Sequence, residues 1–273
     1  MGVSLTEGIR NYIKAKMVRY ANITYSSPSE ALKGKRIIVT GGASGIGLAM
    51  AKRFVEEGAS VLIAGRNEEN LEQQSREMGC HALPLDLTKV ETFSNFVKQA
   101  AEKLGGIDCL VNNAGVSLHE WAFMAVKPEG FDKQIATNLK GPFFLTQKVI
   151  INMLKNKIQG QVLFISSETG EMADIRPYGL TKAAINSLVQ GLAYLYIEQG
   201  IRVNAIAPGV TATKMAGYKD QNINCTFNPN GRAYLPEEIA EVAAFLLSDV
   251  SGSISGQIIT CNNGKSINAR WKI

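Results

Sequence analysis

The sequence predicts an α/β fold, a doubly wound, seven-stranded parallel sheet of the Rossmann type preceded by an N-terminal extension. Short apolar runs, typical of buried parallel strands, recur along the chain, and helical patterns of ten residues or more separate most of them. A glycine-rich turn directly follows the first of these runs. Such alternation implies right-handed crossovers, helices on both faces of the sheet, and ligands gathered at the carboxyl ends of the strands.

The predicted strands follow one another at intervals that leave room for a crossover helix between most of them. They are Arg36–Thr40, Ser60–Ala64, Ala82–Leu85, Ile107–Val111, Gln161–Ile165, Ile201–Ile206 and Gln257–Thr260. A chain of 273 residues can bury one full core of this kind, so residues 34–273 are predicted to form a single dinucleotide-binding catalytic domain.

Residues 1–33 are left as an extension. Ile9, Ile13 and Met17 fall at helical spacing, which favours an amphipathic helix that docks on the domain or on a neighbouring subunit. A frayed leader is the alternative. Neither this segment nor the rest of the chain has the unbroken apolar run of a signal peptide or membrane span, so no export by that route and no membrane partner are expected.

Composition argues against metal and nucleic-acid chemistry. The cysteines and histidines show no metal-ligand spacing; they are Cys80, Cys109, Cys225, Cys261, His81 and His119. Scattered thiols of this kind are typical of a reduced compartment, which predicts a cytoplasmic location. The net charge of +5 is not gathered into a basic stripe, so no nucleic-acid partner is expected, although the charge favours an anionic cofactor.

The glycine-rich turn Thr40–Gly47 runs into a predicted helix, Leu48–Glu57. Gly41 permits the tight turn, Gly45 lets the backbone approach a phosphate, and Gly47 allows close helix packing, while the helix start presents N–H groups to a pyrophosphate. The predicted cofactor contacts here are Gly41, Ser44, Gly45, Ile46 and Gly47. The alternative is a tight connector without a ligand.

Arg66 predicts the phosphate state of the cofactor. An NAD enzyme offers an acidic side chain to the ribose at the end of the second strand, but this chain has Gly65 followed by Arg66. A guanidinium can bind a 2'-phosphate through two parallel hydrogen bonds. We therefore expect NADP(H), with NAD possible, and the alternative is that Arg66 is a solvated cation at a helix start.

Tyr178 and Lys182 lie one turn apart in the predicted helix Tyr178–Glu198, so both side chains leave the same face. A nearby ammonium and the nicotinamide cation would both favour the phenolate form of the tyrosine. Tyr178 is then expected to exchange a proton with an alcohol or alkoxide while hydride crosses at the same carbon. Alone, such a pair is more often a solvated surface pair.

The order of these motifs resembles the short-chain dehydrogenase/reductase family. The turn spacing Thr-Gly-x-x-x-Gly-x-Gly is followed in sequence by Asp86, Asn112–Gly115, Asn138, Ser167 and Tyr178-x-x-x-Lys182, and the resemblance runs from about Gly34 to Gly264. It implies that Asp86 and Leu87 border the adenine and that Asn113, Ala114 and Gly115 line the cofactor. Asp86 could instead cap the next helix, and Asn112 could join adjacent strands.

The resemblance also assigns a catalytic set of Asn138, Ser167, Tyr178 and Lys182. Tyr178 and Lys182 count as cofactor contacts too, with Lys182 on the nicotinamide ribose. Ser167 would bind the substrate oxygen; Ser166 competes for that role, although Gly170 favours Ser167. Asn138 would open a helix and hold a water that leads to Lys182, or it is structural.

After the sixth strand, the resemblance implies a segment that holds the nicotinamide carboxamide. Its predicted contacts are Pro208, Gly209, Thr211 and Thr213. The polar stretch Lys214–Leu235 is expected to be the substrate lid. His119, Glu120 and Trp121 are expected to border the cleft, and Asn262-Asn263-Gly264, which replaces the family's usual Asp-Gly-Gly, is expected to alter only a subunit contact.

The expected function is that of an oxidoreductase moving hydride between NADP(H) and a carbonyl or secondary alcohol of a small or medium-sized substrate. A non-catalytic dinucleotide-binding protein on the same fold is the alternative, which the intact catalytic set disfavours. A homotetramer or homodimer is expected because family members pair through the helices that correspond to Glu129–Leu154 and Tyr178–Tyr196.

Overall fold

The computed structural model describes residues 12–13, 16–20, 30–218 and 222–267, and within these it confirms the predicted fold. Seven parallel strands form one sheet in the order β3-β2-β1-β4-β5-β6-β7. The strands are β1 (Arg36–Thr40), β2 (Ser60–Gly65), β3 (His81–Pro84), β4 (Cys109–Asn112), β5 (Gln161–Ile165), β6 (Arg202–Pro208) and β7 (Ile258–Cys261). The order reverses between β1 and β4, the position where such sheets bind ligands.

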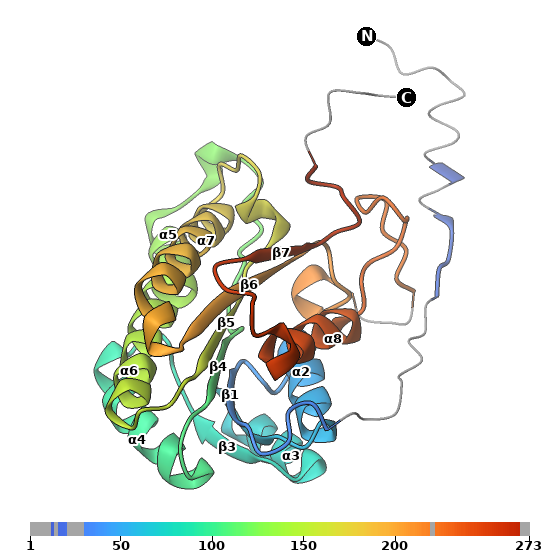
Figure 1. Cartoon of the computed structure of the whole chain (residues 1–273). Helices are drawn as coiled ribbons and strands as arrows, with labels where there is room; N and C mark the ends of the chain where they lie inside the picture. Colours follow the sequence, from blue (N-terminus) through green and yellow to red (C-terminus); the bar gives the residue numbers. More distant parts are fainter. Residues whose placement is uncertain (1–11, 14–15, 21–29, 219–221, 268–273) are drawn as a thin grey trace.

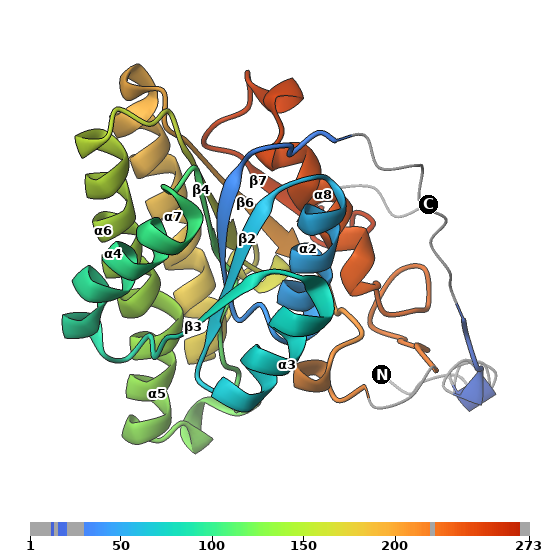
Figure 2. The same cartoon turned by 90° about the horizontal axis from the view of Figure 1, so that it is seen from below.

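Helices cover both faces of the sheet (Figure 1, Figure 2). One face carries α4 (Phe93–Leu104), α5 (Pro128–Ile135), α6 (Gly141–Lys155) and α7 (Pro177–Tyr196), and the other carries α2 (Gly45–Glu56), α3 (Glu68–Met78) and α8 (Pro236–Leu247).

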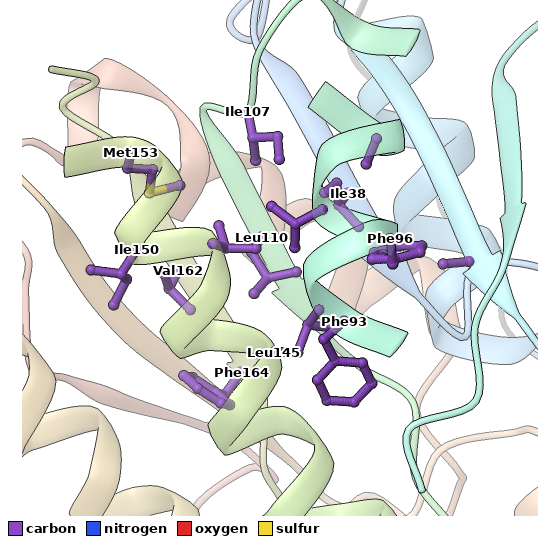
Figure 3. Close-up of a cluster of buried hydrophobic side chains, with 14 of the residues drawn as sticks. Ile38, Phe93, Phe96, Ile107, Leu110, Leu145, Ile150, Met153, Val162 and Phe164 are labelled. Carbon is purple, nitrogen blue, oxygen red and sulfur yellow. The ribbon is translucent and has the colours of Figure 1, made fainter. Parts of the chain in front are cut away.

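Each face of the sheet has its own apolar core, because successive strand residues point to opposite faces. Ile38, Leu110 and Val162 face the helices α4 and α6, where Phe93 and Leu145 pack against them (Figure 3). The strand neighbours on the other face pack under α2, α3 and α8; they include Ile37, Val39, Val111 and Leu163. The sheet is therefore buried on both sides, as its apolar strands predict.

Two predicted strand ends are wrong by two residues, and seven others differ by one. The fourth strand begins at Cys109 and not at Ile107. The preceding residue, Asp108, binds Arg36: its carboxylate accepts the backbone N–H of Arg36 at 2.9 Å and the Nε–H at 2.7 Å. Ile107 is nevertheless fully buried, which explains why it resembled a strand residue. The sixth strand runs on to Pro208, so it reaches further toward the predicted cofactor segment than expected.

The N-terminal extension is described only in part. Leu32 is fully buried and its backbone N–H donates to the Glu57 carbonyl at 3.2 Å, so packing begins two residues before the predicted boundary at 34. Ile13 and Met17 are exposed, whereas Ile9 lies outside the described residues, so the predicted amphipathic helix stays a prediction. Arg19 does contact the predicted lid, because its carbonyl accepts the N–H of Ile223 at 3.2 Å.

No described helix is both long enough and apolar enough to span a membrane. The described residues also contain no cluster of three or more histidine, cysteine, aspartate or glutamate side chains that could hold a metal ion. All four cysteines are free thiols. The cytoplasmic location stays a prediction.

Candidate active site

Thr40, the last residue of β1, ties the ends of β1 and β4 together. Its hydroxyl donates to the Val111 carbonyl at 3.2 Å and accepts the N–H groups of Asn113 at 3.0 Å and Ala114 at 3.1 Å. The sequence-based prediction gave this residue no role. A hydroxyl residue that ends a buried strand just before a glycine turn is the signal that could have found it.

The glycine turn is built as the sequence predicts. Gly41 has a φ of +66° and Gly45 a φ of +53°, values that residues with a side chain rarely adopt. A Cβ atom at Gly47 would collide with the Gly41 carbonyl oxygen, so only glycine lets α2 start this close to the turn. The Asn113 amide supports the turn from below by donating to the Thr40 carbonyl at 2.9 Å.

The start of α2 fits a pyrophosphate. Ser44 is the exposed N-cap residue, and its hydroxyl makes no capping bond to the helix. The N–H groups of Gly45, Ile46 and Gly47 belong to the first turn, which has no preceding turn to accept them. These donors, the free hydroxyl and the positive end of the helix dipole are the groups that bind an anionic phosphate.

The segment Pro208–Thr213 connects the end of β6 to this turn. Gly209 N–H donates to the Cys261 carbonyl at 2.9 Å, and the Thr211 hydroxyl donates to the Gly209 carbonyl at 3.0 Å. At the far end, a Cβ on Gly45 would lie 3.3 Å from Cγ2 of Thr213. The structure therefore brings the predicted carboxamide segment and the predicted phosphate turn side by side.

The predicted adenine end lies at the ends of β2 and β3. The Asp86 carboxylate accepts the N–H of Thr88 at 2.9 Å and its hydroxyl at 2.8 Å. Asp86 thus closes a turn and does not cap the next helix. These bonds lower the pKa of the Asp86 carboxyl, and the charge of Arg66 acts in the same direction. Leu87 is buried in the core beside α4, with its backbone next to Gly141.

Arg66 is exposed and stands between β2 and α3. It is not the start of the helix, because Asn67 is the N-cap and accepts the N–H of Asn70 at 2.9 Å. The Arg66 guanidinium therefore does not cap α3, and it stands at the end of β2, where an adenosine ribose would lie.

Tyr178, Lys182 and Ser167 meet where α7 passes the end of β5. The Ser167 hydroxyl accepts the N–H of Thr169 at 3.3 Å and its hydroxyl at 3.0 Å, and it lies near enough to Tyr178 to lower the pKa of that side chain. Lys182 is buried, with Nζ 5.5 Å from the centre of the Tyr178 ring and 2.7 Å from the carbonyl oxygen of Ile165, to which it donates. The helical spacing thus places both side chains on the face that the sequence predicts.

Burial of this pair acts against the expected phenolate form of Tyr178. Burial is the largest influence on Tyr178 and raises the pKa of its hydroxyl, while Ser167 and Arg176 lower it. Burial also lowers the pKa of Lys182 to about 8. The protein alone therefore favours the neutral phenol, which is the form that gives up a proton in a reduction.

The two adjacent serines have different hydrogen-bond partners. The Ser166 hydroxyl points into the core, where it donates to Oδ1 of Asn186 at 2.6 Å. The Ser167 hydroxyl instead bonds Thr169 and lies near enough to influence Tyr178. This arrangement favours Ser167 over Ser166, as Gly170 does, and the role of Ser167 stays a prediction.

Asn138 and Asn112 differ from expectation. Asn138 does not open a helix; it lies in the π-helical segment Ala136–Lys140, which joins α5 to α6 without a break. Its amide is paired with both backbone groups of Val116, each at 2.8 Å. It still borders the site, because a Cβ on Gly115 would lie 3.3 Å from Asn138 Oδ1 and 3.8 Å from Lys182 Nζ. Asn112 does not join adjacent strands but donates to Thr146 of α6 at 2.8 Å.

The loop after β4 reaches toward the predicted lid. A ring nitrogen of His119 lies 3.0 Å from the Met215 carbonyl oxygen, and the exposed Trp121 ring lies under the Arg176 guanidinium at 5.1 Å. The lid segment Lys214–Leu235 has a small apolar cluster of its own, built on Ile223, Cys225 and Ala233. Its role in covering a substrate stays a prediction.

The expected effect of Asn262-Asn263-Gly264 on a subunit contact stays a prediction, but Asn262 itself is buried. It is 2% exposed, and its amide donates to Glu168 at 3.2 Å and to Ser266 at 2.9 Å. Asn262, the first residue of the sequence that replaces Asp-Gly-Gly, therefore contacts Glu168, the residue that follows Ser167 at the end of β5.

The strand order, the glycine turn and the grouping of Tyr178, Lys182 and Ser167 are consistent with an oxidoreductase of the dinucleotide-binding class, and comparisons with known proteins agree. The family model described as enoyl-(acyl carrier protein) reductase matches residues 41–266. The 3-oxoacyl-[acyl-carrier-protein] reductase FabG of Thermotoga maritima is 35% identical over 245 residues, covering 85% of this chain and 98% of that protein. The 2,5-dichloro-2,5-cyclohexadiene-1,4-diol dehydrogenase LinX of Sphingobium indicum is 35% identical over 246 residues, covering 86% and 98%.

A solved structure agrees with these relatives. The 3-ketoacyl-(acyl-carrier-protein) reductase of Brucella melitensis, complexed with NADH, is 31% identical and superposes with a TM-score of 0.80 over 86% of this chain and 100% of that chain. The chain belongs to the short-chain dehydrogenase/reductase family, and it is an oxidoreductase that uses a nicotinamide dinucleotide.

Proposed function

We propose that the protein reduces a ketone, or oxidises the corresponding secondary alcohol, of a small or medium-sized substrate and prefers NADP(H) over NAD(H). The observation that carries this proposal is the meeting of Tyr178, Ser167 and Lys182 at the end of β5, beside the segment Pro208–Thr213. Two relatives named as a 3-oxoacyl reductase and a diol dehydrogenase support carbonyl and alcohol carbons as the reacting groups.

Each side chain of the catalytic set has a distinct task in a reduction. The Ser167 hydroxyl would hold the carbonyl oxygen, and Tyr178 would donate its proton to that oxygen as it becomes an alkoxide. The Lys182 ammonium would stabilise the resulting phenolate, and Asn138 would keep the loop at Val116 in place beside Lys182. A bound nicotinamide would supply the hydride to the carbonyl carbon, or accept it in the oxidation.

The cofactor would lie across the ends of β1, β2 and β4. Its pyrophosphate would meet the turn of Gly41, Ser44, Gly45, Ile46 and Gly47, and the 2'-phosphate would meet Arg66. The adenine would lie by Asp86 and Leu87, and the chain Asn113–Gly115 would line the dinucleotide. Lys182 and Tyr178 would contact the nicotinamide ribose, and the carboxamide would bind Pro208, Gly209, Thr211 and Thr213.

A screen of pooled ketones and secondary alcohols tests the proposal. Absorbance of the reduced nicotinamide is followed with NADPH and NADH for the ketones and with the oxidised forms for the alcohols. Turnover of at least one pool, lost in Tyr178→Phe, is the expected result. Tight nucleotide binding without turnover of any pool would favour the alternative of a non-catalytic dinucleotide-binding protein.

Carbonyl reduction is expected to fall as pH rises through about 8, because burial lowers the pKa of Lys182 to about 8 and only its ammonium form can stabilise the phenolate. The pH profile of kcat/KM measures this limb. In Lys182→Arg the cation persists to much higher pH, so the limb should move upward. If the fall in kcat/KM stayed near its original pH in Lys182→Arg, the titrating group would be a residue other than Lys182.

The protein is also expected to form a homodimer or homotetramer through α6 and α7. These helices leave a surface pocket lined by Leu139, Phe143, Ala184 and Leu188, and large apolar side chains such as Ile151 remain exposed nearby. Light scattering should show more than one subunit at micromolar concentration, and Phe143→Glu should reduce the assembly. Phe227→Glu, at an exposed aromatic residue of the lid, is the control. A wild-type monomer would contradict the prediction.

A further inference from the structure

An ion pair between a buried carboxylate and a partly exposed lysine lies beside the catalytic set but outside it. Glu168 directly follows Ser167 and is 4% exposed, and one of its carboxylate oxygens lies 2.6 Å from Nζ of Lys265. Lys265 belongs to the chain that follows β7, so the pair joins residues 97 positions apart. The pair therefore links the end of β5 to the end of β7.

The other carboxylate oxygen of Glu168 is bound from the same side. Asn262, just after β7, donates its amide to this oxygen at 3.2 Å, and the same amide group donates to Ser266 at 2.9 Å. Both oxygens of one buried carboxylate are thus held by the segment that follows β7.

Gly209, just after the end of β6, packs against both Glu168 and Asn262. A Cβ atom on Gly209 would lie 3.2 Å from the Glu168 carboxylate, 3.1 Å from Cβ of Asn262 and 2.7 Å from the Tyr234 ring. Because Gly209 has no side chain, its backbone can pack directly against the Glu168 carboxylate. Gly209 is the second residue of the proposed carboxamide segment, and its N–H donates to the Cys261 carbonyl at 2.9 Å.

Stability alone does not account for a charged pair in this place. Removing a carboxylate and an ammonium from water is costly, and neutral side chains of similar size are often no less stable there. A charged pair with a further hydrogen bond from Asn262 does, however, fix position well.

We propose that Glu168 is a positioning residue for hydride transfer. Its carboxylate, held by Lys265 and Asn262, sets the distance between Ser167 on one strand end and Gly209 on the next. If Ser167 holds the substrate oxygen and the Gly209 segment holds the nicotinamide, this distance controls how closely the reacting carbons approach. The inference rests on the proposed function in this respect.

Glu168→Gln and Lys265→Met test the inference. Each keeps most of the side-chain size and removes one charge. A displacement of about 1 Å at reacting atoms can cost about a hundredfold in rate, so we expect kcat to fall about ten- to a hundredfold in each variant. The primary isotope effect with nucleotide deuterated at the transferred position should rise, since hydride transfer becomes slower than the other steps. Lys265→Arg should restore most of the rate because it keeps the charge.

A second readout does not need turnover. Hydrogen–deuterium exchange in residues 208–213 should become faster in Glu168→Gln, and calorimetry should show weaker NADPH binding. If the screen found no substrate, these two measurements would still decide whether Glu168 positions the Gly209 segment. The double variant Glu168→Gln/Lys265→Met leaves no unpaired buried charge, so it keeps the test valid if a single variant fails to fold.

Asp108→Asn is the matched control. It breaks an ion pair with Arg36 that is 2.7 Å long and lies at the amino ends of the central strands β1 and β4, whereas Glu168 lies at the carboxyl end of β5. This variant is expected to lower thermal stability without changing the isotope effect or the exchange of residues 208–213. If Glu168→Gln behaved like this control, or kept wild-type kcat and exchange, Glu168 would be a stabilising residue only and the inference would be wrong.

Discussion

Tyr178→Phe is expected to lower turnover by about two to four orders of magnitude, the range seen when a general acid or base is lost. The substitution removes only the hydroxyl of Tyr178, while the ring keeps its place near Lys182. The first turn of α7 is also retained, because Thr181 bonds to the backbone carbonyl of residue 178 at 2.6 Å and not to its side chain. Fold and nucleotide affinity should therefore persist.

Steady-state kinetics and calorimetric nucleotide titration on one sample separate the possible outcomes. Tyr194→Phe, on the same helix but 89% exposed, controls for the loss of any tyrosine hydroxyl. Turnover retained in Tyr178→Phe would remove Tyr178 from the mechanism. Collapse of nucleotide binding would make it a structural residue.

The strands could be predicted because a parallel sheet covered on both faces needs continuous apolar runs, and each of the seven leaves one. Strand ends depend on individual side chains. Ile107 is as buried as a strand residue, yet Asp108 next to it binds Arg36, a partner 72 positions away. Periodicity carries no information about such a pairing.

The site was predictable where function depends on local spacing. Glycines at fixed intervals determine the turn, and one helical turn determines that Tyr178 and Lys182 share a face. Asn138 was harder, because a π-helical segment inside a continuous helix shows the same apolar pattern as an ordinary helix. The contact between Glu168 and Lys265 joins two surface-type residues from distant strand ends, so only the fold reveals it.

Arg66→Ala is expected to reduce the preference for NADPH over NADH by about ten- to a hundredfold. A charge-assisted contact to a 2'-phosphate contributes about 1.5 to 3 kcal/mol, which corresponds to that range. Arg66 is exposed, so solvent and salt would favour the lower end. The charge of Arg66 lowers the pKa of Asp86, so the two side chains are close. The Asp86 carboxylate would therefore repel a 2'-phosphate at Arg66, which also favours a change near tenfold.

Gly65→Asp tests the same preference from the opposite direction. A Cβ at Gly65 would meet only the Leu71 side chain, at 3.9 Å, and the backbone there is not left-handed, so a side chain fits without strain. The new carboxylate would repel a 2'-phosphate and could accept both ribose hydroxyls, which shifts preference toward NADH. Arg76→Ala, at an exposed arginine near the far end of α3, is the control for a lost cation. The ratio of kcat/KM values with the two nucleotides should fall in both test variants and stay unchanged in the control. A wild type that prefers NADH, or an unchanged ratio in Arg66→Ala, would show that Arg66 is a solvated cation without a role in cofactor choice.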